Sequence, residues 1–471
     1  MSSPTLRLPP PALKARWLGE PLLGFAHGVA HPDPKVGIPY AGPRSLGTPR
    51  HREAVHIGLI GTAQGVEATR GYLESAAGGV DGDETHHPFP GFRPDRGFRT
   101  DLRIDDARVA VITAAERRSV LDSTKGQRVR FEELLGILED RVRYLANIEA
   151  PVDLVLVVLP YDVAKRCATA NYVEDGRLAH RDLHSALKAR CMRYRMPTQL
   201  IWETSAGLVD GHSADQHQAD VAWSLFTAIY FKADGSPWSP IGLSDGTCFV
   251  GIDFYQPPQS PASARASFAQ VFAETGDAFV LPGAPVRGDW TGRSPHLRAE
   301  ESASLIANVR EAYAQTFGLQ PQHVVVHKRT PFGDAERQGF EEALSDIEFD
   351  LATVRPSDHM RLVRNGEYPP HRGTLYSFGE DSYLYTTGAL AVAGLYPNEH
   401  VSGPLNISHH TGHSSYDRLL QDILLLTKMN WNSGRYAEQM PMTLELADRV
   451  GNVLKESGPD SDLESKYAFY V

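Results

Sequence analysis

Three residues in the second half of the chain suggest a nuclease site that lacks most of its acids. Asp253 lies in the apolar run 249–255, which predicts a strand that carries one carboxylate. A second apolar run, 323–327, leads into Lys328 and Arg329, where a partner carboxylate would be needed. Two-metal cleavage of a phosphodiester requires several acids, which hold two cations about 3.5–4 Å apart. Because Lys and Arg repel cations and attract phosphates, this pattern favours holding a nucleic acid over cutting it.

A second group of residues has the chemistry of a phosphate site. His184 and Lys188 stand four residues apart, so their side chains share one face of a predicted helix. Both donate hydrogen bonds to a phosphate, His184 most strongly when protonated, and Gln199 adds a neutral donor. Lys232, at the end of an apolar helix predicted over 220–231, adds a point charge. Taken alone, a His/Lys pair at this spacing is more often a solvated helix face, and the nearby basic residues favour the phosphate site only modestly: Arg190, Arg193 and Arg195.

Two further patterns have weaker chemical meaning. The segment 58–65 places glycines after a predicted strand, as a dinucleotide-binding turn does, but its spacing departs from G-x-G-x-x-G. His409, His410 and His413 suggest a metal site, yet Gly412 interrupts the helix that such spacing would need. We therefore expect a polar loop before a helix here, which brings one late ligand near Asp253.

Composition limits the class of protein. A chain of 471 residues with 41% hydrophobic and 22% charged residues is long enough for two or three domains with full cores. The three scattered cysteines are typical of a reducing compartment, and no apolar run is long enough to span a membrane, so we expect a cytoplasmic protein without a membrane partner. The net charge of −11 opposes a simple nucleic-acid binder, although a focused basic cleft still concentrates phosphate.

The elements that position these residues follow from the apolar runs. Continuous runs at 55–60, 109–112, 154–159 and 199–202, separated by helical stretches, predict a parallel sheet covered on both faces. The second half begins with strands at 248–255, 267–273 and 278–281, followed by a helix at 300–317, a strand at 323–327 and a helix at 334–344. This is the order of an RNase H-like sheet. Further strands are predicted at 351–354 and 383–387, and helices at 416–428 and 443–455.

In this order the motifs resemble a short prokaryotic Argonaute, a protein of MID and PIWI domains. The MID-like motifs are His184-x-x-x-Lys188, Met196-Pro-Thr-Gln199 and the turn 232–238; the PIWI-like motifs are Val250-Gly-Ile-Asp253, Val326-His-Lys-Arg-Thr330 and the segment 422–432. The resemblance implies an α/β fold, with an irregular lead-in segment (1–52), a Rossmann-like MID domain (53–242) and an RNase H-like PIWI domain (243–471). One departure is Asp234, where the family usually has Gly or Leu.

The resemblance also implies roles for individual residues. The ligands of a guide 5′-phosphate would be His184, Lys188, Gln199 and Lys232. A Mg²⁺ ion would bridge guide phosphates and the C-terminal carboxylate of Val471, and Asp253 would be a remnant metal ligand. The nucleic-acid backbone would be held by Arg193, Lys328, Arg329 and Lys428.

The function implied is guide binding without catalysis. The family pattern for cutting is Asp, Glu, Asp and a final Asp or His, and only Asp253 is plainly present. A 5′-phosphorylated guide RNA would pair with single-stranded DNA of an invader, and the chain would then activate a partner with an APAZ domain and a TIR or sirtuin-like domain that consumes NAD⁺. Two alternatives remain: a guide-directed endonuclease that uses Asp253 with non-standard ligands, and a Rossmann-type nucleotide-binding enzyme.

Overall fold

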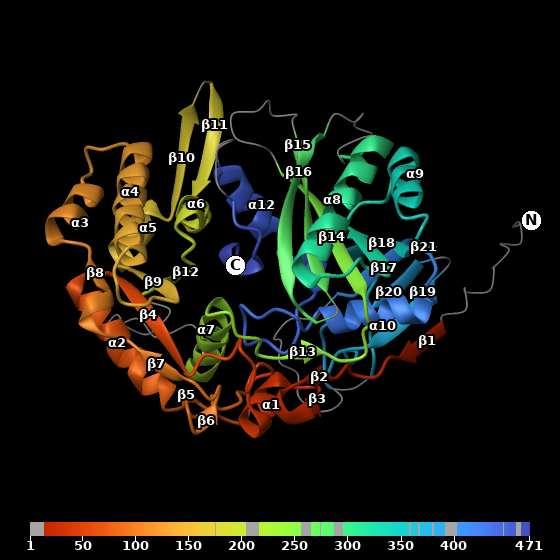
Figure 1. Cartoon of the computed structure of the whole chain (residues 1–471), viewed down its shortest axis with the longest axis horizontal. Coiled ribbons are helices and arrows are strands. Elements are labelled where there is room, and N and C mark those ends of the chain that lie inside the picture. Colours follow the sequence, from red (N-terminus) through yellow and green to blue (C-terminus); the bar gives the residue numbers. More distant parts are fainter. Residues whose placement is uncertain are drawn as a thin grey trace, which may run out of the picture.

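The chain folds around two separate sheets, which Figure 1 shows side by side. The computed structural model describes residues 14–174, 176–203, 216–255, 265–273, 275–286, 295–357, 359–365, 368–378, 381–390, 403–445, 447–457 and 463–471. No helix within these ranges is both long and apolar enough to cross a membrane. The C-terminus and the last long helix lie between the two sheets (Figure 1), so the end of the chain helps to join them.

The first sheet has five strands and is parallel, as the apolar runs predict. Its order is β12-β9-β4-β7, with β8 also paired to β4. The strands are β4 (Ala54–Gly61), β7 (Asp101–Arg103), β8 (Val109–Val111), β9 (Leu154–Leu159) and β12 (Thr198–Trp202). The helices of this region are α2 (Ala63–Ala77), α3 (Ala114–Leu121), α4 (Gln127–Ala146), α5 (Tyr161–Cys167), α6 (Leu183–Cys191) and α7 (Gln218–Lys232). Every residue of β9 is buried, which is why its sequence is a continuous apolar run.

Short elements that the sequence did not predict complete this half. A two-stranded hairpin, β10 (Thr169–Glu174) with β11 (Arg177–Asp182), precedes α6 and projects from the fold in Figure 1. The remaining pieces are β5 (Phe92–Arg93), β6 (Arg96–Gly97) and the 3₁₀ turns Asp106–Arg108 and Met192–Tyr194. The hairpin does not alternate like an ordinary half-buried strand pair, because its exposed face carries the apolar Val173 and Leu178 while its half-buried face includes Arg181.

The second sheet confirms the RNase H-like order. Strands β14 (Thr247–Tyr255), β15 (Arg265–Ala273) and β16 (Ala278–Val286) are antiparallel, whereas β17 (His323–Lys328) and β18 (Glu348–Pro356) run parallel to β14 on its other side. Side chains of β14 alternate between two cores: Cys248, Val250 and Ile252 pack with α8 (Ala299–Phe317) and α9 (Asp334–Ala343). Phe249 packs in the other core with α10 (Tyr416–Leu426), α11 (Met442–Glu445) and α12 (Ala447–Glu456). The sheet is therefore covered on both faces.

The N-terminal segment belongs to the fold, which corrects the expectation of an irregular lead-in. Strand β1 (Lys14–Trp17) pairs with β19 (Thr374–Phe378) at the edge of the nine-stranded sheet. Strands β2 (Leu23–Gly24) and β3 (Ala30–His31) form a small sheet with β13 (Ser239–Pro240), next to α1 (Pro34–Ala41) and the 3₁₀ turn Ala26–Gly28. These strands are two to four residues long, too short for a pattern to reveal.

Toward the C-terminus the structure differs from the predicted elements in two places. His409 and His410 lie in a strand, β21 (Leu405–Gly412), rather than in a loop. β21 pairs with β18 and with β20 (Asp381–Leu384), so backbone pairing overrides the polar character of the segment. The helix predicted over 443–455 appears as α11 and α12, and the chain ends after the 3₁₀ turn Tyr467–Phe469.

Contact between β14 and α11 leaves no room for a side chain at Gly251. A Cβ atom there would lie 1.8 Å from the carbonyl oxygen of Thr443, which is backbone and cannot swing away. We expect Gly251→Ala to lower the free energy of unfolding by about 3 kcal/mol or more, at the upper end of the cost of overpacking. Gly136→Ala in α4 is the control, because its Cβ meets nothing within 4 Å and Ala favours helix by up to about 1 kcal/mol. Chemical denaturation of both variants measures the difference, and equal stabilities would contradict this packing.

Candidate nucleic-acid interface

The phosphate-site residues predicted from the sequence converge at one place. Lys188, in α6, donates from Nζ to the terminal-residue oxygen of Val471 at 2.5 Å and to the carbonyl oxygen of Thr198 at 3.2 Å. Lys232, the last residue of α7, donates to Oε1 of Gln199 in β12. Val471 is buried, so the end of the chain is part of the site. His184, one turn before Lys188, experiences the charges of both lysines.

A fifth basic or polar group in this site comes from a residue that the sequence did not single out. The charge of Arg449, in α12, acts on His184, Lys188 and Lys232 and lowers the pKa of each. α12 packs on α6, where Glu456 pairs with Arg181 at 2.5 Å. Arg449 lies more than 200 residues from the other three in sequence. No local motif therefore marks it. Its position in the sequence, shortly before the apolar C-terminal tail, is the one feature that could have suggested that it lies near the site.

The site holds its basic groups in an electrostatically unfavourable state. Burial is the largest cause: it lowers the pKa of Lys188 to about 7 and takes the pKa values of Lys232 and His184 well below their usual ranges. Mutual repulsion with Arg449 adds to this effect. Within the described ranges, none of these four side chains lies within 4 Å of an Asp or Glu carboxylate. The cluster contains the buried Lys188 and Lys232 and the exposed Arg449, and no acidic side chain balances it, although Lys188 contacts the terminal-residue oxygen of Val471. Such an excess of basic groups favours an anion that enters the site.

The depressed pKa of Lys232 makes the stability of the free protein depend on pH. The unfolded chain keeps the ordinary Lys pKa of 10.5, whereas the folded chain has a lower value. Between the two values the unfolded state binds more protons, so the free energy of unfolding rises with pH. The increase from one lysine is at most about 1.4 kcal/mol per pH unit. Urea titrations between pH 7 and 10 should show this increase, and Lys232→Met should make it smaller; an unchanged slope in the variant would contradict the assignment.

The arginines around the site are already neutralised by acids from other elements. Pairs join Arg181 to Glu132 and Glu456, Arg190 to Glu132 and Glu139, Arg193 to Glu139, and Arg195 to Glu464. The run 181–200 is strongly basic in sequence, but its guanidinium groups are balanced in space. Arg193, predicted to hold the nucleic-acid backbone, keeps 57% of its side chain exposed and lies 3.3 Å from Glu139.

The nuclease-like position in the second sheet contains a guanidinium between two carboxylates. Arg329 Nη1 lies 3.9 Å from Asp253 Oδ2 and 3.3 Å from Asp448 Oδ2, and Nη2 donates to the carbonyl oxygen of Leu444 at 2.8 Å. Burial raises the pKa of Asp253, and Arg329 opposes that shift. Asp448 is the second residue of α12, directly before Arg449, and no local pattern marks its proximity to Asp253. A cation from the protein thus occupies the space between the two acids.

Two lysines predicted to hold the nucleic-acid backbone lie inside the protein instead. Lys328 is 1% exposed and donates to both carboxylate oxygens of Glu336, at 2.6 and 2.7 Å. Lys428 is 2% exposed and donates to Glu20 at 2.8 Å. Each ammonium group compensates a buried glutamate, which favours a structural role and corrects the expectation of a backbone contact.

The histidines near the C-terminus lie too far from Asp253 to complete a site with it, because β18 and β17 separate β21 from β14, roughly 14 Å across the sheet. His410 Nε2 is 2.8 Å from Asp350, which His323 contacts at 2.6 Å. In the register of the sheet, Asp350 of β18 lies opposite Val325 of β17, and Val325 lies opposite Phe249 of β14. Phe249 precedes Asp253 by four residues, roughly 13 Å along the strand. The expectation that His409, His410 or His413 places a late ligand near Asp253 is therefore wrong.

The turn after β4 carries an acid where a dinucleotide phosphate would bind. Thr62 caps α2 through the Gly65 amide at 3.0 Å, and a Cβ on Gly65 would lie 2.8 Å from Glu203 Oε1. Glu203 also accepts a hydrogen bond from the amide of Tyr161, at the start of the neighbouring helix α5. A carboxylate at this position repels phosphate, so the geometry disfavours the Rossmann-type alternative.

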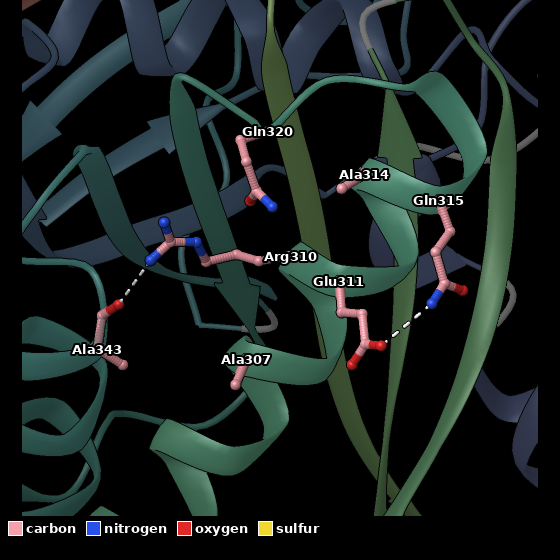
Figure 2. A pocket seen from close by; sticks show the side chains of 7 residues that line it. All are labelled: Ala307, Arg310, Glu311, Ala314, Gln315, Gln320 and Ala343. Atoms are coloured by element: carbon pink, nitrogen blue, oxygen red, sulfur yellow. Dashed lines mark hydrogen bonds between the residues drawn. The ribbon is translucent and has the colours of Figure 1, made fainter.

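A shallow pocket elsewhere offers no comparable chemistry. Figure 2 shows it on α8, lined by Ala307, Arg310, Glu311, Ala314, Gln315, Gln320 and Ala343. Arg310 is satisfied there by the carbonyl oxygen of Ala343 at 3.2 Å and by Asp346. The charged residues that line this pocket, Arg310 and Glu311, are therefore already hydrogen-bonded within the protein.

The residues around Val471 do not fit a Mg²⁺ ion held by the protein. Mg²⁺ prefers a near-octahedral set of oxygen ligands. Here Lys188 donates to the Val471 oxygen, and Lys232 donates to the side-chain oxygen of Gln199. Ammonium groups already contact these two oxygens, so the residues of the free protein do not by themselves supply an oxygen-rich site for Mg²⁺.

No protein-family model and no curated protein sequence matches the chain. Solved structures of Argonautes do match its fold. Clostridium butyricum Argonaute, bound to a guide DNA and a 19-mer target DNA, matches with a TM-score of 0.68 at 15% identity, over 95% of this chain and 54% of that chain. An Aa-Ago structure with externally bound siRNA matches with a TM-score of 0.61 at 15% identity, over 97% and 56%. A. aeolicus Argonaute matches with a TM-score of 0.60 at 15% identity, over 96% and 55%. The chain spans about half the length of these Argonautes, and over that span it has the mixed α/β fold of an Argonaute MID and PIWI region.

Proposed function

We propose that the chain binds the phosphorylated 5′ end of a guide strand in the site formed by α6, β12, α7 and α12. One observation carries the proposal: His184, Lys188, Lys232 and Arg449 converge there without an acidic side chain to balance them. A terminal phosphate carries up to two negative charges and several acceptor oxygens, and it restores the protonated state of the buried lysines. Gln199 lies at the same place, where its Oε1 accepts a hydrogen bond from Lys232 and its Nε2 donates to the carbonyl oxygen of Leu200 at 3.3 Å.

The chain holds a target without cutting it, in this proposal, because Arg329 replaces a metal ion between Asp253 and Asp448. Two-metal cleavage needs anionic ligands that attract cations, and a guanidinium within 4 Å of both carboxylates removes that attraction. Sequence readout then comes from base pairing, with protein contacts to phosphates.

The finer assignment rests on the resemblance to short prokaryotic Argonautes. In it the guide is RNA, the target is single-stranded DNA of an invader, and the partner is an APAZ-containing TIR or sirtuin-like protein that hydrolyses NAD⁺. Co-expression with that effector tests this assignment: adding guide and complementary DNA should start NAD⁺ loss, whereas a non-complementary DNA should not.

Phosphate recognition is tested with guides that differ only at their 5′ end. The untagged chain is titrated with two oligonucleotides of one sequence, one 5′-phosphorylated and one 5′-hydroxyl. Charge-assisted contacts contribute about 1.5–3 kcal/mol each, so the phosphorylated strand should bind at least tenfold more tightly. The proposal would be overturned if the 5′-phosphorylated and 5′-hydroxyl forms bound with equal affinity, for RNA guides and for DNA guides alike.

A further inference from the structure

A cluster of histidines and acids lies apart from both sites described above. Asp83 and His86, in the loop after α2, meet His217, the N-cap of α7. One ligand atom from each lies within 4.8 Å of the other two. His217 Nε2 is 3.6 Å from Asp83 Oδ2, and His86 Nδ1 is 2.8 Å from Asp83 Oδ1. The two imidazole rings are stacked, with centroids 4.3 Å apart and planes 7° apart.

We propose that Asp83, His86 and His217 bind one transition-metal ion of the Zn²⁺ class. Two imidazoles and one carboxylate are a ligand set that Zn²⁺ takes in proteins, with a fourth position left for water. Ligand atoms around a tetrahedral ion with bonds of 2.0–2.2 Å are roughly 3.4 Å apart, close to the separation of Asp83 from His217. The ion takes the place of the ring protons that face Asp83.

Backbone contacts hold the Asp83 carboxylate and the start of α7 in place before any ion binds, whereas one of the two stacked imidazoles must turn so that both ring nitrogens point at the same ion. Amides of Thr85 and His86 donate to Asp83 Oδ1 at 2.7 and 2.8 Å, which orients the carboxylate. α7 is tied to the other side of the loop, because Trp223 Nε1 donates to the carbonyl oxygen of Pro88 at 3.1 Å. A metal site assembled on such supports loses little conformational entropy on binding.

Asp220 supplies the outer partner that metal-bound histidines commonly have. Its Oδ2 lies 3.7 Å from His86 Nε2, the ring nitrogen that faces away from Asp83. When His86 binds a metal through Nδ1, its proton moves to Nε2 and points to this carboxylate. Lys35 pairs with Asp220 at 2.6 Å, so Asp83, Asp220 and Lys35 together leave one net negative charge, which attracts a cation.

Metal binding also changes how α7 begins. His217 Nδ1 accepts a hydrogen bond from the Ala219 amide at 3.2 Å. Binding through Nε2 moves the ring proton to Nδ1 and removes this bond, so metal binding costs the helix its N-cap. Asn at position 217 keeps a capping oxygen but offers no imidazole, so His217→Asn separates the helix cap from the metal ligand.

The test uses the full-length untagged chain and Co²⁺, whose visible absorption reports its coordination. We expect one equivalent to bind with a tetrahedral spectrum, Zn²⁺ to displace it, and Zn²⁺ to raise the midpoint of thermal unfolding. His86→Ala and His217→Asn should abolish the spectrum, and Asp220→Asn should weaken binding about tenfold. His180→Ala, in the exposed hairpin, is the control and should bind as the wild type does. No tetrahedral spectrum in the folded wild type, or an unchanged one in His217→Asn, would overturn the proposal.

Discussion

Replacing Lys232 with Met is expected to weaken binding of a 5′-phosphorylated guide by roughly 10- to 100-fold, while binding of the 5′-hydroxyl guide stays nearly constant. The reason is that the Lys232 ammonium lies beside Gln199 in the buried cluster, where a phosphate is the expected counter-charge. Met fills a similar volume without a charge. Because burial disfavours the charged form of Lys232 in the free protein, the variant should fold at least as stably as the wild type.

The control for this experiment is Lys455→Met, which removes the same charge from an exposed position on α12, the helix that carries Arg449. Fluorescence anisotropy with both guides gives two affinities for each protein. A loss that is equal for phosphorylated and hydroxyl guides, or that Lys455→Met reproduces, would mean that Lys232 acts through general charge rather than through the terminal phosphate.

Arg329→Asp is expected to create a divalent-cation site at the place where the wild-type chain holds a guanidinium between Asp253 and Asp448. The substitution removes the guanidinium between Asp253 and Asp448 and places a third carboxylate beside them. Three converging acids repel each other, so the variant should be less stable than the wild type without metal, and Mn²⁺ should restore stability by binding the native state. The variant's thermal midpoint should therefore rise with Mn²⁺ concentration more steeply than the wild-type midpoint, which can respond only through the separate cluster of Asp83, His86 and His217.

Arg329→Gln separates the two effects of this change, because it removes the cation without adding an acid. It should show weaker Mn²⁺ dependence than Arg329→Asp. Incubating all three proteins with guide, labelled target and Mn²⁺ also tests the endonuclease alternative. Cleavage by the wild type that is lost in Asp253→Asn would refute the proposal that the chain does not cut.

Much of the fold was predictable because its strands bury both faces. β9 and β17 are continuous apolar runs, and such runs in alternation with helices indicate parallel sheets. β1 and β2 escaped prediction because four or fewer residues carry no periodicity, and β21 escaped because His409 and His410 are polar within it. These strands are defined by partners distant in sequence.

The site was predicted in part for a similar reason. Helical spacing alone puts His184 and Lys188 on one helix face, whereas their meeting with Gln199 and Lys232 was expected from the resemblance to the MID motifs. Arg449 and Asp448 come from α12, which is brought there by packing. The prediction that Lys328 holds the nucleic-acid backbone was wrong because the sequence shows the charge of Lys328 but not that it is buried against Glu336.

The pairing of Arg181, Arg190, Arg193 and Arg195 with glutamates has a consequence for the ionic-strength dependence of guide binding. Nucleic-acid binding that depends on many free cations releases one condensed counterion per phosphate contacted, and its affinity falls steeply as salt is added. Arginine side chains that are already paired with carboxylates displace fewer counterions from the nucleic acid when it binds. Affinity at this end of the guide should therefore depend on a few buried contacts with one terminal phosphate, and it should persist at salt concentrations that strip nucleic acid from an open basic surface.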